Sequence, residues 1–112
     1  MLKLCLYVPV DATEAVKRAL FAAGAGRIGN YDQACWQCSG TGQFRPLAGS
    51  DPTIGTHGGV SRVEELRIEM LVREQDAAAV IAALCEAHPY EEPAYDLTRL
   101  AGAPGVPFDP EA

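Results

Sequence analysis

The sequence of 112 residues has no long hydrophobic run and no cluster of basic residues. No segment reaches the roughly eighteen consecutive apolar residues that a membrane-spanning helix needs. The nine lysines and arginines are scattered and outnumbered by fifteen acidic residues, which gives a formal net charge of −6. Nucleic acids and anionic membrane surfaces attract clustered basic residues, so the composition argues against both kinds of partner.

The N-terminal segment MLKLCLYVPV also lacks the features of an export signal. It has no extended charged region and no small-residue cleavage site, and Asp11 follows it directly. We therefore expect a cytoplasmic protein, in which the four cysteines remain reduced thiols.

Hydrophobic residues make up 48% of the chain, which is enough for the packed core of one domain. We expect this domain over residues 1–100, followed by a loosely ordered tail over 101–112 that is rich in proline and glycine. A domain of this size buries only about two-thirds of its unfolded surface, so additional burial between subunits would stabilise it.

Two periodicities organise the chain on either side of a glycine-rich centre. Leu2, Leu4, Leu6 and Val8 alternate with polar or intermediate residues, as in a half-buried strand. Apolar residues recur at helical spacing after Asp11, which has the character of an N-cap. The predicted strands are 2–8, 63–72 and 94–100, and the predicted helices are about 12–23 and from 73 to the residue before Pro89.

The central stretch from Gly24 to Gly59 contains most of the eleven glycines and the only tryptophan, Trp36. Residues 31–38 and 42–46 are predicted to be two strands joined by a hairpin turn at 39–42. Residues 47–59 are predicted to be a loop. Two strand–helix–strand halves over one antiparallel sheet predict an α+β, ferredoxin-like βαββαβ sandwich with an extra long β-hairpin.

Several segments of the sequence resemble one known family. They are Gly29-Asn30-Tyr31, the stretch Gly40–Pro46, the stretch His88–Asp96 and the charged strand Val63–Glu69. They resemble the insert domain of the YqfO, or Nif-three-like, proteins over roughly the first hundred residues. The motif His-Pro-Tyr-Glu-x-Pro also resembles the CutA proteins, which share the fold.

The resemblance implies a PII-like or CutA-like domain that tends to form trimers. In the full-length family, this domain is inserted into a larger one that carries a two-metal centre. That larger part is absent from this sequence, so neither its ligands nor its proposed hydrolase activity can be carried over. The family pattern commonly has one cysteine where Cys35 stands, so Cys38 departs from it.

Cys35 and Cys38 form a C-x-x-C motif. A zinc site needs four ligands, and a second such motif is missing. The redox form of the motif normally opens a helix, whereas no helix is predicted after Cys38. In a regular strand the two cysteines would point to opposite faces, so we favour the interpretation that they are small apolar residues of a strand. A turn between them would restore the metal interpretation.

The two histidines are the candidate metal ligands. His57 lies in a glycine loop, and His88 precedes the carboxylates of Glu91 and Glu92. A divalent metal ion on His57, His88 and Glu91 is one interpretation. In the structural alternative, His57 is a solvated loop residue and His88 complements the helix dipole at the C-terminus of a helix. The resemblance implies that Tyr90 and Glu91 help to fix a subunit contact.

Gly40-Thr41-Gly42 can present backbone N–H groups to an anion, and Arg45 is placed to assist. No Walker lysine and no helix follow these glycines, so a hairpin turn is the favoured interpretation. Asn30 and Tyr31 serve equally well as ligand contacts or as turn residues.

We predict a homo-oligomer, specifically a trimer, that binds a small molecule or a divalent metal ion in clefts between subunits. It would act as a sensor or regulatory module and not as a catalyst. Two alternatives stay open: a metal-assisted hydrolase, and a pure interaction module that docks on a separate two-metal protein. The predicted ligand-binding residues are Asn30, Tyr31, Cys35, Thr41, Gly42, Arg45, His57, His88, Tyr90 and Glu91; His57, His88 and Glu91 are the metal candidates.

Overall fold

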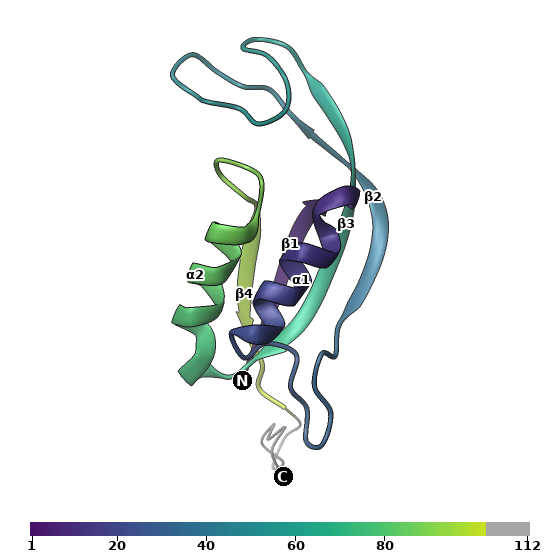
Figure 1. Cartoon of the computed structure of the whole chain (residues 1–112), viewed down its shortest axis with the longest axis vertical. Helices are drawn as coiled ribbons and strands as arrows, with labels where there is room; N and C mark the ends of the chain where they lie inside the picture. The colour runs from purple at the N-terminus through teal and green to yellow at the C-terminus, as the bar shows by residue number, and fades with distance from the viewer. Residues whose placement is uncertain (103–112) are drawn as a thin grey trace.

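Strand β1 (Leu2–Pro9) lies inside a four-stranded antiparallel sheet in the computed structural model, which describes residues 1–102 (Figure 1). The order across the sheet is β2-β3-β1-β4, and helix α1 and helix α2 connect the strands of the two halves. The predicted ferredoxin-like βαββαβ sandwich is therefore confirmed. The other strands are β2 (Trp36–Phe44), β3 (Ser61–Val72) and β4 (Tyr95–Arg99).

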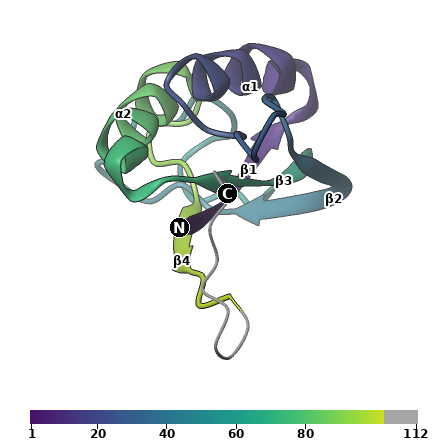
Figure 2. The same ribbon diagram turned by 90° about the horizontal axis from the view of Figure 1, so that it is seen from below.

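Helices α1 (Thr13–Ala22) and α2 (Ala77–Ala87) both lie over one face of the sheet (Figure 2). The even-numbered residues of β1 point toward them and form the core with alternate residues of β3. Within residues 1–102, no helix covers the opposite face. The fully buried large side chains are Leu4, Leu6, Val8, Val16, Leu20, Ile68, Val72, Val80 and Leu84.

The start of each helix differs from the prediction. A short 3₁₀ helix precedes each one: η1 (Val10–Ala12) before α1 and η2 (Glu74–Asp76) before α2. The predicted N-cap at Asp11 is wrong, because Asp11 lies within η1 and its side chain caps no backbone N–H group. The hydroxyl of Thr13 instead donates to the carbonyl of Pro9, at 3.2 Å.

The two short strands predicted at 31–38 and 42–46 are also wrong. They are replaced by one strand, β2, in which Gly40 and Gly42 pair with Glu65 and Val63 of β3. Gly42 lacks a side chain because a Cβ atom there would collide with the carboxylate of Glu65, and not because it makes a turn. The hairpin connection is the long segment 45–60, where the predicted loop is confirmed.

The connecting segments gather at two ends of the sheet (Figure 1). Residues 23–35 lie at the same end as the N-terminus, whereas residues 45–60 and 88–94 lie at the other end. The N–H of Leu100 donates to the carbonyl of Met1 at 3.0 Å, so the two ends of the domain meet. The predicted tail lies outside the described residues from 103 onward. No helix in residues 1–102 is both long and apolar enough to cross a membrane.

Candidate functional site

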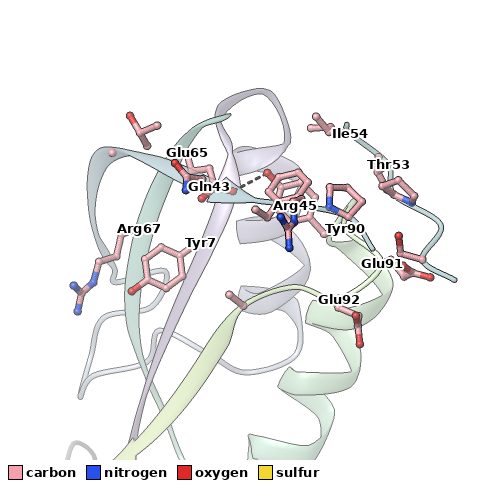
Figure 3. A pocket seen from close by; sticks show the side chains of 18 of the residues that line it. Tyr7, Gln43, Arg45, Thr53, Ile54, Glu65, Arg67, Tyr90, Glu91 and Glu92 are labelled. Atoms are coloured by element: carbon pink, nitrogen blue, oxygen red, sulfur yellow. Dashed lines mark hydrogen bonds between the residues drawn. The ribbon is translucent and has the colours of Figure 1, made fainter. Parts of the chain in front are cut away.

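A cavity of about 700 Å³ lies at the end of the sheet that carries the 45–60 loop (Figure 3). Its volume is in the range that binds small organic molecules. Three segments of the chain surround it: residues 38–47 from β2 onward, the loop residues between 50 and 54, and the turn 90–94. Tyr7, Glu65 and Arg67 complete the lining from β1 and β3.

Two hydrogen bonds hold the 45–60 loop against the turn after α2. The hydroxyl of Thr53 donates to the carbonyl of Pro89 at 2.6 Å, and the N–H of Asp51 donates to Oε1 of Glu91 at 3.0 Å. Both bonds join segments that are more than thirty residues apart in the sequence. The cavity is therefore assembled within a single chain.

A buried carboxylate, Glu65, forms part of the cavity lining. Glu65 is only 8% exposed, and its Oε2 accepts a hydrogen bond of 2.7 Å from the hydroxyl of Tyr90. Figure 3 shows these two side chains pointing toward one another. Burial, reinforced by the hydrogen bond to Glu65 and by its charge, raises the pKa of Tyr90. Tyr90 therefore remains protonated and acts as the donor.

The Tyr90 ring is fixed by two aromatic neighbours. Its centroid lies 5.9 Å from that of Phe44 and 4.9 Å from that of His88, with tilted rings in both pairs. Tilted arrangements at these distances are favourable for aromatic pairs. Since Phe44 ends β2 and His88 follows α2, Tyr90 joins the two walls of the cavity.

His88 is buried, and both of its ring nitrogens have backbone partners. Nε2 lies 2.6 Å from the carbonyl of Tyr7 and must donate to it, whereas Nδ1 accepts the N–H of Tyr90 at 3.1 Å. This pair of bonds requires the neutral ring with its proton on Nε2. Burial lowers the pKa of His88, which favours the same neutral form. The ring therefore has no lone pair free for a metal ion.

Arg45 is the exposed cation that lines the cavity without an ion-pair partner among residues 1–102. Arg67 also lines it, but pairs with Glu69 at 3.0 Å. A guanidinium group presents several N–H donors in a plane that matches a carboxylate or phosphate group. The cavity thus offers a charged donor for an anionic ligand.

The structure brings some of the predicted site residues together and separates others. Thr41, Gly42, Arg45, Tyr90 and Glu91 all line the cavity. The ring of His88 packs against that of Tyr90. His57 lies in the 45–60 loop, where its Nε2 donates to the carbonyl of Ser50 at 2.8 Å. Asn30, Tyr31 and Cys35 belong to the segment 23–35 that precedes β2. This segment lies at the opposite end of the sheet (Figure 1), so one chain does not bring these residues to the cavity.

The predicted metal and cysteine sites do not form a ligand cluster within the described chain. Cys35 immediately precedes β2, Cys38 lies within it, and both thiols are free and exposed. Among residues 1–102, no group of three or more His, Cys, Asp or Glu side chains is arranged to hold a metal ion. His57, His88 and Glu91 therefore do not meet as a metal site in this chain.

Glu65 and Thr53 belong to the site but were not predicted. Glu65 stands in a strand where charged residues alternate with apolar ones, which is typical of a solvated face. Its burial depends on the pairing of β2 with β3, which leaves room for its carboxylate over Gly42, and on the turn after α2, which brings Tyr90 to it. The absence of a side chain at Gly42 is the signal for this packing, and it becomes meaningful only once β2 and β3 are paired.

The fold defines the class of protein: a ferredoxin-like domain of the CutA type. Over 92% of its length the chain superposes on 87% of the periplasmic divalent cation tolerance protein CutA from Archaeoglobus fulgidus, with a TM-score of 0.63. The two sequences are 12% identical, so this similarity concerns the fold alone. CutA1 from Shewanella sp. SIB1 gives a TM-score of 0.65 at 16% identity, over 93% of this chain and 84% of that one.

Within that class, the predicted resemblance to the Nif-three-like, or YqfO, proteins is confirmed. The chain is 46% identical over 103 residues to the GTP cyclohydrolase 1 type 2 homolog of Mycobacterium leprae, covering 92% of this chain and 27% of the relative. Identity is 50% over 99 residues with that of Halalkalibacterium halodurans, covering 88% and 27%. A Bacillus cereus protein related to NIF3 superposes with a TM-score of 0.76 at 43% identity, over 88% of this chain and 25% of that one.

The chain spans about a quarter of the length of the curated relatives that it matches. No family model matches it.

Proposed function

We propose that this chain is a regulatory module that binds a small anionic molecule in the cavity beside Arg45. The observation that supports this most strongly is the cavity of about 700 Å³, which residues of a single chain line and in which Arg45 has no counter-ion among residues 1–102. A carboxylate or phosphate group would supply that counter-ion.

The wall next to Arg45 adds further donors for such a ligand. Thr41 brings a hydroxyl to the lining. Strand β2 lies at the edge of the sheet, so alternate backbone N–H groups of β2 have no partner strand within residues 1–102. A Cβ atom at Gly40 would meet nothing within 4 Å, so a ligand can approach this backbone closely at Gly40.

The side chains around the cavity favour binding over catalysis. A nucleophilic hydroxyl or thiol usually requires a neighbouring base with a free lone pair. His88 is the histidine nearest to Tyr90, and its two nitrogens are already used by backbone groups. The lining residues therefore include no histidine poised to activate a nucleophile.

We further propose a cytoplasmic homotrimer that assembles through the part of the uncovered sheet face around Trp36, which is not among the residues that line the cavity. Trp36 is paired with Glu69 of β3, and Glu69 is paired with Cys5 of β1. Cys5 is an odd-numbered residue of β1 and points away from the helices, so Trp36 lies on the uncovered face. Trp36 is 58% exposed. Burial of such a large aromatic surface would stabilise an assembly. The four free thiols fit a reducing compartment. Light scattering should give three times the single-chain mass; the mass of one chain would contradict this.

Titration calorimetry tests the proposed binding. The panel contains nucleotides, common carboxylate and phosphate metabolites, and divalent metal ions; GTP is included because the curated relatives are named after a GTP cyclohydrolase. We expect at least one anion to bind, and Arg45→Gln to weaken it by about tenfold or more, as expected for a lost charged hydrogen bond.

Arg62→Gln is the matched control. Arg62 is an exposed residue of β3 outside the cavity lining, and its replacement removes the same charge. Binding should change by less than about twofold in this variant, because exposed charges outside the site contribute little. An equal loss in both variants, or no binding across the panel, would contradict the proposed function.

A further inference from the structure

We infer that Glu65 makes the cavity selective for ligands that carry a protonated nitrogen as well as an anionic group. The ligand would then be a small zwitterion of the amino-acid type. This inference rests on the proposed function, because it takes Arg45 as the partner of the anionic group and adds a second, oppositely charged contact.

The first support is the incomplete hydrogen bonding of a buried charge. Glu65 is 8% exposed, and Tyr90 is the donor to its Oε2. Among residues 1–102, no other group donates to this carboxylate and no basic side chain forms an ion pair with it. Burying a carboxylate without a counter-charge is costly, so a cationic ligand group would stabilise this arrangement.

The second support is the position of the unbonded oxygen. Oε1 of Glu65 occupies the space that a Cβ atom at residue 42 would need, so the glycine at 42 is what admits the carboxylate there. Both residues line the cavity. The hydrogen bond from Tyr90 to Oε2 holds the carboxylate in one orientation, and this also fixes the position of the unbonded Oε1.

The third support is the division of charge along the lining. Arg45 supplies the positive group, and Glu65 supplies a buried negative one. Glu91 is a weaker candidate for the second contact, because it is exposed and its Oε1 accepts the N–H of Asp51. An ammonium group offers Glu65 both charge and hydrogen-bond donors, whereas a hydroxyl offers a donor only.

A series of simple acids tests this inference. The probes are glycine, 3-aminopropanoate, 4-aminobutanoate and 5-aminopentanoate, each compared with the acids in which hydrogen or hydroxyl replaces the amino group. The chain is titrated with each probe, and binding is followed by amide chemical shifts. We expect at least one amino acid to bind about tenfold more tightly than both of its counterparts, as for a charged hydrogen bond.

Two variants assign the preference to Glu65. Glu65→Gln removes its charge, and Gly42→Ala displaces the carboxylate through the added Cβ while keeping the charge. Each should reduce the preference for the amino acid to less than about threefold, whereas Arg45→Gln should weaken all acids alike. If Glu65→Gln does not fold, Gly42→Ala provides the same comparison with the native carboxylate present.

The outcomes separate this inference from the proposed function. Equal binding of amino and unsubstituted acids to the native chain would overturn the inference and leave anion binding intact. A preference that persists in Gly42→Ala and Glu65→Gln would also overturn it. If none of the acids binds, the inference fails, and the calorimetric panel decides the proposed function separately.

Discussion

The hydroxyl of Tyr90 donates a hydrogen bond of 2.7 Å to Oε2 of Glu65 and so joins the turn after α2 to strand β3. The two residues are 25 positions apart, and Phe44 and His88 hold the tyrosine ring in place. Because Glu65 is buried, this bond stabilises both the carboxylate and the cavity wall.

Tyr90→Phe removes the hydroxyl and keeps the ring. The buried carboxylate of Glu65 then loses its donor, which should lower the free energy of unfolding by about 1–3 kcal/mol. Urea unfolding at matched protein concentration measures the change. Tyr31→Phe is the control, since Tyr31 is 77% exposed and should change stability by less than about 0.5 kcal/mol. Similar stabilities for the two variants would show that the bond contributes little.

His88 should make the fold sensitive to acid. Burial lowers the pKa of His88, although the charge of Glu65 acts in the opposite direction. The unfolded chain therefore takes up a proton at this site first as the pH falls below about 6.5. The contribution of His88 to stability is present above that pH and is lost progressively toward the lower pKa of the folded state.

His88→Gln should flatten this dependence between about pH 7.5 and pH 5, because a glutamine does not titrate. His57→Gln is the matched control, since His57 is exposed. This variant should keep the native dependence of the unfolding free energy on pH, measured by denaturant unfolding across the same pH range. A native slope in His88→Gln would mean that other groups cause the acid sensitivity.

Gly26 should be intolerant of a side chain. Its φ of +79° lies in the left-handed region, and a Cβ atom would stand 2.9 Å from the carbonyl oxygen of Ala34 and from the ring of Phe21. Gly26→Ala should therefore cost about 1–3 kcal/mol in unfolding free energy. Gly40→Ala is the control, because a Cβ atom there meets nothing within 4 Å and φ is not positive. Thermal unfolding measures both variants, and an equal loss of stability in the two would contradict the assignment of strain to Gly26.

Thr53→Val should loosen the 45–60 loop without unfolding the domain. The change removes the 2.6 Å bond to Pro89 and keeps the shape of the side chain. The amide of Asp51, which bonds to Glu91, should then exchange with solvent several-fold faster, because local opening becomes easier. Thr56→Val, in the same exposed loop, should leave this exchange rate unchanged. Unchanged exchange in Thr53→Val would mean that other contacts hold the loop.

The sheet and helices were largely predictable because they repeat a simple pattern. Alternation in β1 and β3 placed both strands within two residues of their observed ends. The helix ending before Pro89 was also predicted, since the residue before a proline is forced out of helical geometry.

The glycine-rich centre was predicted less well, because glycine has several structural uses. Gly40 and Gly42 suggested a turn, yet they lie within β2, where Gly42 makes room for Glu65. Arg45 and Tyr90 were predicted as site residues from motifs in their own segments. Glu65 was not, because its burial depends on residues more than twenty positions away on either side.

The central claim is that the cavity beside Arg45 is the binding site. A titration of the isotope-labelled chain with the tightest-binding anion of the panel, followed at each backbone amide, tests it most directly. We predict saturable shifts concentrated at residues 40–45 and 90–94, and their loss in Arg45→Gln. Shifts concentrated at residues 23–35, at the other end of the sheet, or the same shifts in Arg45→Gln, would contradict the claim.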